Sequence, residues 1–472
     1  MHLVVVGGSD AGISAGLRAR QLDPSAEVTL VVADAYPNFS ICGIPYYISG
    51  DVVDWRNLAH RTRADLEVAG LTLRLDTRAT RIDHDRRELA VTEADGATAR
   101  IGYDALVVGT GAVPVRPPIV GLTGPDALGE TDGVHLLHTM GETFALQRAL
   151  ARGPATALIV GAGYIGLEMA EALTARGIRV TQVEQLPEVL PTVDPELGAL
   201  VHDELTRHGV DVVTGATVTQ ISRTANGLSV AGTTSTGSIE WDVDLVLVVV
   251  GVRPDTALLT AAGVKTGARG AVLVDDTMAT SLPGVWAAGD CVITHHRQLG
   301  ESYLPLGTTA HKQGRVAGAN AVGSHARFHG SLGTQVVKVF DLVIARTGLR
   351  DHEAQARGHQ PITVTSSPDD HKAYYPTAYP ITIRLTGDAT TGLLLGAQLV
   401  GWLGTEVSKR VDTYAAALHH QMTVAEISDL DLSYTPPLGS PWDAVQLAAQ
   451  AWESQVATLP ADPAPRRLRP VH

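Results

Sequence analysis

The residues best suited to chemistry are two cysteines, Cys42 and Cys291, which stand far apart in the sequence. Two cysteines at that separation exclude a disulfide scaffold and a cysteine-rich zinc module. No second cysteine follows Cys42 in the next turn, so an internal dithiol is excluded. A lone sulfur can accept an electron pair only while it is bonded to something else, as in a mixed disulfide, a persulfide or a sulfenic acid. Any thiol redox chemistry must therefore rest on a single residue.

Histidines occur in pairs at helical or neighbouring spacing, but no pair comes with an acidic or thiol ligand set. The sequence therefore predicts no metal site. The pairs are His135 with His138, His325 with His329, His295 with His296, and His419 with His420.

Two segments repeat one pattern: an apolar strand, a glycine-rich turn, a helix, and a second strand about twenty residues later. Each predicts a βαβ unit whose helix N-terminus can hold a dinucleotide pyrophosphate, because glycines let the backbone approach and unpaired N–H groups face the anion. The first turn is less regular, since a serine replaces the middle glycine. The expected cofactor-binding residues are Gly7, Gly8, Ser9 and Gly12 in the first turn and Gly161, Gly163 and Gly166 in the second.

Two dinucleotide sites in one chain mean that electrons or hydride pass between two carriers, which indicates a flavoprotein that uses a nicotinamide. Glu184 closes the second strand of the second unit, where a nucleotide ribose is expected. A carboxylate there accepts hydrogen bonds from a 2′-OH and repels a 2′-phosphate. NADH is therefore favoured, and NADPH stays open because Arg179 or another basic residue could accommodate the phosphate.

The composition is that of a compact protein. Of 472 residues, 44% are hydrophobic and only 18% are charged, which argues against wholesale disorder. The net charge of −14 repels nucleic-acid phosphates and anionic lipid surfaces, so neither is an expected partner. No apolar run approaches the length of about 18 residues that a membrane span needs. The chain starts directly with an apolar strand and shows no basic leader, so we expect a cytoplasmic protein.

Further apolar segments complete the expected fold. Residues 104–111 and 244–251 predict buried parallel strands that end in glycine turns, and Gly251 is counted with the cofactor-binding residues. Residues 284–290 predict another strand, which ends in Asp290. The fold class is α/β, with two Rossmann-like dinucleotide-binding domains and a C-terminal α+β domain. The C-terminal elements are expected as strands at 334–339, 381–385 and 393–399 and a helix at 408–419.

Residues 38–48, Asn-Phe-Ser-Ile-Cys-Gly-Ile-Pro-Tyr-Tyr-Ile, resemble the redox-cysteine segment of the pyridine nucleotide-disulfide oxidoreductase superfamily. Over roughly residues 1–452 the chain resembles its single-cysteine branch, which comprises coenzyme A disulfide reductases, NADH oxidases and NADH peroxidases. Further matches follow in order: Thr110-Gly111-Ala112, Gly289-Asp290, Leu304-Pro305-Leu306, Gln313-Gly314-Arg315 and Tyr434-Thr435-Pro436-Pro437.

The resemblance implies an FAD domain split around an NAD(P)H domain. It also implies a C-terminal domain that forms a homodimer and completes the active site of the partner subunit. The expected divisions are residues 1–120 and 256–328 for the FAD domain, 121–255 for the NAD(P)H domain, 329–452 for the dimerisation domain and 453–472 for a flexible tail.

The resemblance also implies residue roles. Asp290 would bond the FAD ribityl chain, and Thr110 and Gly111 would lie near the flavin nucleotide. Tyr164 resembles the gate over the flavin that moves aside for nicotinamide, and Glu168 resembles the acid beside it.

In the family the redox sulfur, here Cys42, lies at a helix N-terminus beside the flavin ring, a placement that lowers a thiol pKa. Cys291 is expected to be a small packed residue.

The first nucleotide site departs from the family pattern. Val32 stands where an acid for the FAD ribose is expected, and the nearest carboxylate is Asp34, so the strand end is reshaped or the contact is missing. Asp10 stands where oxidases and peroxidases of the branch carry a histidine near the sulfur, which speaks against peroxide as the substrate. An aspartate there could act as a base, hold the thiol protonated or cap the helix.

The C-terminal segment favours a disulfide substrate. Tyr374-Tyr375-Pro376 and Tyr434 match segments that, in coenzyme A disulfide reductases, present tyrosine hydroxyls to the sulfur from the other subunit. Against this, Ile41 stands where these reductases have asparagine. The ADP end of coenzyme A would need cations, for which Arg18, Arg20, Arg61 and Arg63 are available unless they are ordinary surface arginines.

We therefore expect a homodimeric FAD enzyme that takes hydride from NADH and reduces a low-molecular-weight disulfide, persulfide or polysulfide. One alternative is an NADH oxidase or peroxidase that cycles Cys42 through sulfenic acid, and another is a redox sensor without turnover. The candidate catalytic residues are Cys42, Asp10, Tyr374, Tyr375 and Tyr434.

Overall fold

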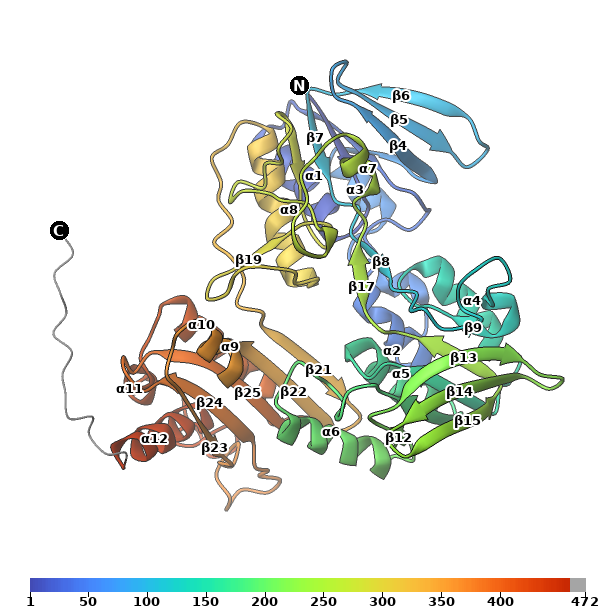
Figure 1. Cartoon of the computed structure of the whole chain (residues 1–472). Helices are drawn as coiled ribbons and strands as arrows, with labels where there is room; N and C mark the ends of the chain where they lie inside the picture. Colours follow the sequence, from blue (N-terminus) through green and yellow to red (C-terminus); the bar gives the residue numbers. More distant parts are fainter. Residues whose placement is uncertain (459–472) are drawn as a thin grey trace. The chain divides into compact units, whose positions relative to one another are not determined.

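The structure is a computed structural model that describes residues 1–458 (Figure 1). The chain divides into two compact units, Met1–Ser331 and Leu332–His472. Among the helices of residues 1–458, none is both long enough and apolar enough to span a membrane.

The first unit contains two parallel sheets built from apolar strands. The side chains of the central strands are buried on both faces, which explains why these strands are nearly continuous runs of Val, Leu, Ile and Ala. The first sheet has the order β18-β7-β1-β2-β3, so its last strand in the sequence lies at one edge. Its strands are β1 (His2–Val6), β2 (Glu27–Val31), β3 (Leu71–Arg74), β7 (Ala105–Val108) and β18 (Val285–Ala287).

The second parallel sheet has the order β12-β11-β10-β16-β9. In each sheet the strand before the glycine turn pairs in parallel with the strand after the helix, so both expected βαβ units are confirmed. The strands of this sheet are β9 (Val134–His135), β10 (Thr156–Val160), β11 (Arg179–Val183), β12 (Asp211–Val213) and β16 (Leu245–Val248).

Two three-stranded antiparallel sheets, which the sequence did not predict, also belong to the first unit. They are formed by β4 (Thr77–Asp83), β5 (Glu88–Glu93) and β6 (Thr98–Gly102), and by β13 (Thr217–Arg223), β14 (Leu228–Thr234) and β15 (Gly237–Val243). Two further antiparallel pairs join β8 (Ala112–Pro114) to β17 (Val252–Pro254) and β19 (Thr294–His296) to β20 (Gly300–Ser302).

The helices of the first unit connect these strands. The two longest near the first glycine turn are α1 (Asp10–Leu22) and α8 (Gly307–Ala321). The others are α2 (Ile44–Ser49), α3 (Arg63–Val68), α4 (Met140–Leu150), α5 (Tyr164–Ala175), α6 (Pro195–Arg207) and α7 (Ala257–Ala261).

The second unit is an α+β domain, as expected. Its five-stranded antiparallel sheet has the order β21-β22-β25-β24-β23. Tyr414 is fully buried, and its hydroxyl donates to the carbonyl of Val445 at 3.1 Å, which ties α10 to α12. The strands are β21 (Gln335–Val339), β22 (Leu342–Gly348), β23 (Pro361–Ser366), β24 (Thr382–Asp388) and β25 (Leu394–Trp402), and the helices are α9 (Asp351–Ala356), α10 (Val407–His419), α11 (Val424–Ser428) and α12 (Ala444–Ala457).

The second unit differs from expectation at its end. Helix α12 runs to Ala457, so residues 453–457 are helical where a flexible tail was expected. The rest of that expected tail, residues 459–472, lies outside the described residues. The division of the first unit into FAD-binding and NAD(P)H-binding domains stays a prediction.

Helices α1 and α8 approach each other backbone to backbone. A Cβ on Gly314 would lie 2.2 Å from the carbonyl oxygen of Ala11, and one on Gly318 would lie 2.1 Å from that of Ala15. Neither glycine has a positive φ, so the requirement is space rather than conformation. This contact fixes the start of α1 against α8.

We expect Gly314→Ala to lower the free energy of unfolding by about 1–3 kcal/mol, because overpacking forces the two helices apart. Gly141→Ala in α4 is the matched control, since its Cβ would meet no atom closer than Thr139 Oγ1 at 3.8 Å. There the helix propensity of alanine should leave the stability unchanged or raise it by up to about 1 kcal/mol. Denaturant unfolding measures both, and equal effects would refute this account of the packing.

Candidate functional site

The first candidate site forms at the carboxyl edge of the first sheet. Strands β1, β7 and β18 run in parallel register, with Val6 opposite Val108 and Val108 opposite Ala287. The turns that follow them therefore meet at one edge, which is where nucleotides bind in such sheets. Gly7 has a φ of +113°, and a Cβ there would lie 2.1 Å from the carbonyl oxygen of Gly109. Only glycine fits this position.

The turn leaves helix α1 open to an anion. A Cβ on Gly12 would lie 2.0 Å from the carbonyl oxygen of Gly7, so turn and helix touch directly. Ser9 occupies the N-cap position without a hydrogen bond from its side chain to the helix. The first N–H groups of α1 therefore remain available to a pyrophosphate, and the turn fits a dinucleotide.

The end of β2 is reshaped at the position where an acid was expected. Val32 is buried, and its Cγ1 would lie 2.6 Å from a Cβ on Gly8, so its side chain packs on the glycine turn. Asp34 accepts a hydrogen bond from the amide of Tyr36 at 2.9 Å. Burial raises the pKa of Asp34, and the charge of Asp76 raises it as well. The hydrogen bond from the amide of Tyr36 lowers this pKa, but the net shift is upward.

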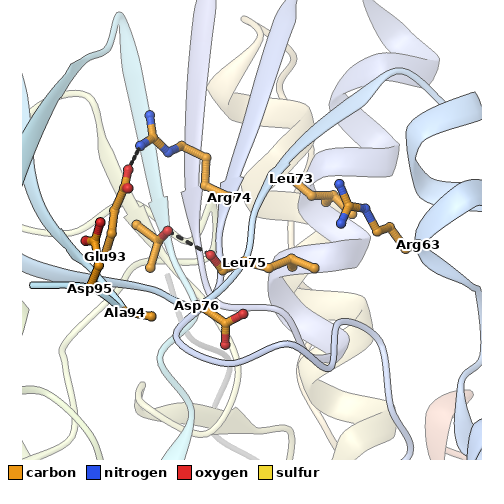
Figure 2. A pocket seen from close by; sticks show the side chains of 9 residues that line it. Arg63, Leu73, Arg74, Leu75, Asp76, Glu93, Ala94 and Asp95 are labelled. Atoms are coloured by element: carbon orange, nitrogen blue, oxygen red, sulfur yellow. Dashed lines mark hydrogen bonds and ion pairs between the residues drawn. The ribbon is translucent and has the colours of Figure 1, made fainter. Parts of the chain in front are cut away.

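A pocket of about 500 Å³ opens at the carboxyl end of β3, next to this strand end (Figure 2). Arg74 and Glu93 form an ion pair in its wall. Asp76 lines the pocket, and its amide donates to the carbonyl oxygen of Asp34 at 3.0 Å. The carboxyl edge of the sheet thus continues past Asp34 into a polar pocket on the side where the nucleotide sugar is expected.

The second glycine turn has the same construction and more room. Gly161 has a φ of +105°, and a Cβ on Gly166 would lie 2.2 Å from its carbonyl oxygen. A Cβ on Gly163 would meet nothing within 4 Å, so the start of α5 is accessible to a pyrophosphate. The buried carboxylate of Glu184 accepts hydrogen bonds from the amides of Ala162 at 2.8 Å and Leu186 at 3.0 Å. It therefore braces the turn from the ribose side.

Thr110, Gly111 and Gly251 lie where the chain crosses between the two parallel sheets. The hydroxyl of Thr110 donates to the carbonyl of Asp255 at 2.5 Å, and the amide of Asp255 donates to the carbonyl of Gly111 at 2.9 Å. Gly251 has a φ of +102° and accepts from the amide of Val115 at 2.9 Å. These bonds tie the two crossing segments together, and the roles of the three residues toward a cofactor stay predictions.

Cys42 lies in a short 3-10 helix, Ile41–Gly43, which leads directly into α2. The residue is exposed to solvent. The segment around it is anchored by a cluster of aromatic rings whose centroids lie 5.2–5.8 Å apart. The cluster consists of Tyr36, Phe39, Trp55 and Phe144.

The chain's own groups raise the pKa of the Cys42 thiol. Loss of hydration is the largest cause, and the nearby carboxylates of Glu168, Asp10 and Asp290 raise this pKa further. We expected the local structure to lower the pKa of this thiol. For the groups that the protein itself supplies this expectation is wrong, because together they raise the pKa. The reason is that the sulfur has lost hydration and that three acids from distant segments add negative charge, while the adjoining helix has only six residues.

Asp10 is the first residue of α1, and Ser9 rather than Asp10 holds the N-cap position. An Oδ atom of Asp10 lies 2.9 Å from the place of a Cβ on Gly307, so the carboxyl group also faces the start of α8. Burial raises the pKa of Asp10, while His60 and His311 lower it. Of the roles considered for Asp10, this placement favours a charge that keeps the thiol protonated.

Asp290 follows β18 at the same edge. Burial and the charge of Asp10 raise its pKa to about 6. The hydroxyl of Tyr303 donates to the backbone carbonyl of Asp290 at 3.0 Å. This bond does not involve the carboxyl group of Asp290. Its neighbour Cys291 is fully buried, with Sγ 3.4 Å from the carbonyl oxygen of Ala288, so it is a packed residue as expected.

The sequence did not predict the link between the Cys42 helix and the second glycine turn. The hydroxyl of Tyr46 in α2 donates to Glu168 in α5 at 3.4 Å. Arg176, just after α5, donates to the carbonyl of Ile48 at 2.9 Å. Tyr46 belongs to the redox-cysteine segment, so its place beside Cys42 was the available signal. Tyr164, the first residue of α5, accepts a hydrogen bond from Thr192 at 3.1 Å.

The candidate tyrosines of the second unit lie on exposed loops. Tyr374 is 73% exposed, Tyr375 43% and Tyr434 44%. The neighbouring hydroxyl of Tyr374 raises the pKa of Tyr434, so these two side chains lie close together. The structure thus brings two of the three together, and their role toward the sulfur stays a prediction.

Three of the four arginines considered for an anionic substrate have local structural partners. Arg20 donates to the carbonyls of Pro24 and Ala26 after α1, and Arg63 pairs with Glu67 at 2.7 Å. Arg18 donates to Gln21 at 2.6 Å. Arg61 remains. Burial is the largest cause that lowers the pKa of His311 in α8, and the positive charges of Arg315, Arg61 and Lys312 lower it further.

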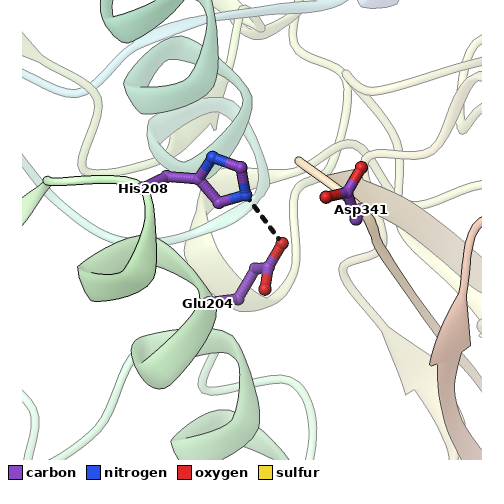
Figure 3. A group of neighbouring side chains, drawn as sticks. All are labelled: Glu204, His208 and Asp341. Atoms are coloured by element: carbon purple, nitrogen blue, oxygen red, sulfur yellow. Dashed lines mark ion pairs between the residues drawn. The ribbon is translucent and has the colours of Figure 1, made fainter.

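Figure 3 draws a further group of titratable residues at the end of α6. Glu204 and His208 form an ion pair at 3.2 Å, and the carboxylate of Glu204 also takes the guanidinium of Arg207 at 2.7 Å. Asp341, drawn in the same figure, belongs to the second unit. The expectation of no metal site stays a prediction.

Comparison with known proteins identifies two family models. The one described as "Pyridine nucleotide-disulphide oxidoreductase" matches residues 1–314, and its "dimerisation domain" matches residues 334–444. An NADH oxidase from Methanocaldococcus jannaschii is 31% identical over 455 residues, which are 95% of this chain and 98% of the relative. An NAD(P)H coenzyme A polysulfide/persulfide reductase from Pyrococcus horikoshii is 30% identical over 451 residues, which are 95% of this chain and 97% of the relative. The structure of a NAD-dependent persulfide reductase from A. fulgidus matches with a TM-score of 0.90 and 35% identity, covering 96% of this chain and 83% of that one.

We expect Asp10→Asn to lower the pKa of Cys42, because it removes one of the negative charges that oppose thiolate formation. Alkylation of Cys42 at pH 7 should then become about three- to tenfold faster. Peptide mapping after iodoacetamide treatment of the FAD-loaded protein measures the rate. Asp23→Asn, at the exposed far end of the same helix, is the control and should leave the rate unchanged. A slower reaction in Asp10→Asn would contradict the electrostatic account.

Proposed function

Because the chain belongs to the pyridine nucleotide-disulphide oxidoreductase family, we propose that it reduces a low-molecular-weight disulfide, persulfide or polysulfide with NADH through Cys42. The protein is an oxidoreductase, and FAD and NAD(P)H are its cofactors. The observation that carries the proposal is one solvent-accessible cysteine without a second cysteine in reach, whose thiol pKa is raised by loss of hydration and by three carboxylates. Relatives named for persulfide and polysulfide reduction support the substrate class.

The residues present fit both nucleotides. The turn at Gly7 and Gly12 would hold the pyrophosphate of FAD, and the turn at Gly161 and Gly166 that of NADH. The chemistry that FAD would supply when held there is the acceptance of hydride from the nicotinamide and the transfer of an electron pair to a nearby acceptor. We assign Asp290, at the edge shared by β7 and β18, to the FAD side of this arrangement.

Cys42 would relay the electron pair to sulfur. In the proposed step, two electrons break the bond between Sγ of Cys42 and the outer sulfur of its mixed disulfide or persulfide. The outer sulfur leaves with one proton as a thiol or hydrogen sulfide, and Sγ remains as a thiolate. The thiolate then attacks the next disulfide or polysulfide, which restores the bonded form and releases a second thiolate. Asp290, whose pKa is raised to about 6, is the group that can supply the proton.

The acceptor is proposed to carry an anionic group. Besides burial, the positive charges of Arg315, Arg61 and Lys312 lower the pKa of His311, and the hydroxyl of Ser14 lies 2.7 Å from Nδ1 of that histidine. Burial raises the pKa of Asp10, and the charge of His311 in turn lowers it. These cations suit a phosphate-bearing thiol such as coenzyme A, which the name of one relative includes.

The active unit is proposed to be a homodimer. The match to the dimerisation domain supports self-association, and the second unit exposes large apolar side chains that a monomer would leave in water. Tyr374, Tyr375 and Tyr434 would then reach the sulfur of the partner subunit. The most exposed of these side chains are Leu438 at 77%, Tyr374 at 73% and Leu403 at 62%.

A second candidate function is NADH oxidation by oxygen. It is supported by the relative named NADH oxidase, which is 31% identical over nearly the whole chain. In that case Cys42 would cycle between thiolate and sulfenic acid. Asp10, which replaces the histidine expected in such enzymes, argues against it.

We expect Cys42→Ser to lower anaerobic NADH-dependent reduction of coenzyme A disulfide and polysulfide by at least about 10³-fold, because serine cannot form the bonded sulfur intermediate. FAD content should stay the same. Cys291→Ser, at the buried packing cysteine, is the control and should retain the disulfide activity. Fast oxygen-dependent NADH consumption together with no disulfide or polysulfide activity in the wild type would replace this proposal with the oxidase.

We expect Glu184→Ala to narrow the preference for NADH over NADPH by about tenfold, because it removes the charge that repels a 2′-phosphate. Affinity for NADH should also fall, since the amides of Ala162 and Leu186 lose their acceptor. Steady-state kinetics with both nucleotides measure the ratio. Glu188→Gln, a nearby acid paired with His202 at 3.1 Å, should leave the ratio unchanged.

A further inference from the structure

Residues 369–380 of the second unit, here named the tyrosine loop, carry Tyr374 and Tyr375. The base of the loop is closed by a bridge between Asp369 and Pro380. Asp370 closes it further: its amide donates to the carbonyl of Tyr379 at 2.9 Å, and its carboxylate accepts from the amide of Tyr379 at 2.8 Å. The base is thus held by bonds to the backbone on both sides. Within the tip, the amide of Tyr375 donates to the carbonyl of Lys372 at 2.8 Å, but neither bond partner belongs to the base.

His371 is the side chain that reaches from the base to the tip. It is only 7% exposed. Nδ1 lies 2.8 Å from a carboxylate oxygen of Asp370, and Nε2 lies 3.2 Å from the carbonyl oxygen of Pro376. Both partners are acceptors, so both bonds exist only when both ring nitrogens carry a proton. A neutral imidazole satisfies one partner and leaves the other without a donor.

The surrounding charges favour the protonated ring. The hydrogen bond to Asp370 is the main cause that raises the pKa of His371, with the Pro376 carbonyl and the charge of Asp369 adding to it. The ring meets Tyr375 edge-on, with centroids 5.7 Å apart. From α10, the buried Arg410 donates to the backbone carbonyl of Asp370 at 2.8 Å, and its charge is balanced by Asp443 at 2.8 Å. Lys372 points to the ring of Trp442 instead, at 5.6 Å.

We propose that protonated His371 is a pH-dependent clamp that holds the tyrosine loop and thereby positions Tyr374 and Tyr375. The effect of the clamp on catalysis rests on the proposed function, whereas the clamp itself does not. Below the pKa of His371 both bonds are made. As the pH rises through that raised value, the ring loses one proton and one bond, and the tip of the loop is released.

The test compares hydrogen exchange of the tyrosine loop at pH 6 and pH 9 in the FAD-loaded protein, corrected for the intrinsic pH dependence of exchange. In the wild type we expect about tenfold or greater loss of protection in the loop at pH 9, and no such loss in α10. His371→Gln should remove the protection at both pH values. His359→Gln is the matched control, because His359 also pairs with a carboxylate, Asp388 at 3.1 Å, but lies outside the loop.

Protection of the loop that is the same at both pH values in the wild type would overturn the proposal, even if His371→Gln fails to fold. Retained protection in a folded His371→Gln variant would overturn it too. If the proposed function also holds, the KM for the disulfide should rise from pH 6 to pH 9 in the wild type and stay flat in His371→Gln. Absence of disulfide reduction at every pH would instead contradict the proposed function and leave the exchange result valid.

Discussion

The arrangement of the first unit depends on one close backbone contact, between the turn after β1 and the turn after β7. Gly7 can lie against Gly109 only without a Cβ, and Gly12 against Gly7 in the same way. This contact fixes where α1 begins, and the glycines of α8 then fix α8 against α1. Asp10, the start of α8 and the strand end before Asp290 are therefore placed together by backbone packing, independently of any side-chain hydrogen bond.

The same packing creates an electrostatic cost at the sulfur. Asp10, Glu168 and Asp290 all oppose a free thiolate at Cys42. Once Sγ of Cys42 is bonded to a second sulfur, Sγ itself carries no charge and does not experience this repulsion. The carboxylates thus shift the balance from free thiolate toward a protonated or sulfur-bonded Cys42. This is the balance expected of a site that carries its substrate sulfur on the cysteine, and it also drives a newly formed thiolate to react.

The sequence was sufficient for the features that depend on local pattern. Apolar runs followed by glycines predicted β1, β7, β10 and β16, because buried parallel strands have a distinctive composition. The sheet β4-β5-β6 was not predicted, because its strands are half exposed and charged residues interrupt their apolar residues. The raised pKa of Cys42 could not be predicted, since the acids responsible are at positions 10, 168 and 290 and meet only in the folded chain. The Tyr46–Glu168 bond was missed for the same reason.

The helix that follows the sulfur is joined by hydrogen bonds to the helix that begins at the second nucleotide turn. Tyr46 and the carbonyl of Ile48 in α2 are bonded to Glu168 and Arg176, which belong to α5 or directly follow it. Helix α5 begins at the second glycine turn, and α2 begins just after Cys42. A displacement of α5 on nucleotide binding must therefore either move α2 or break these two bonds. The polar contacts between α2 and α5 thus provide a direct physical path by which occupancy of the second turn can alter the surroundings of Cys42.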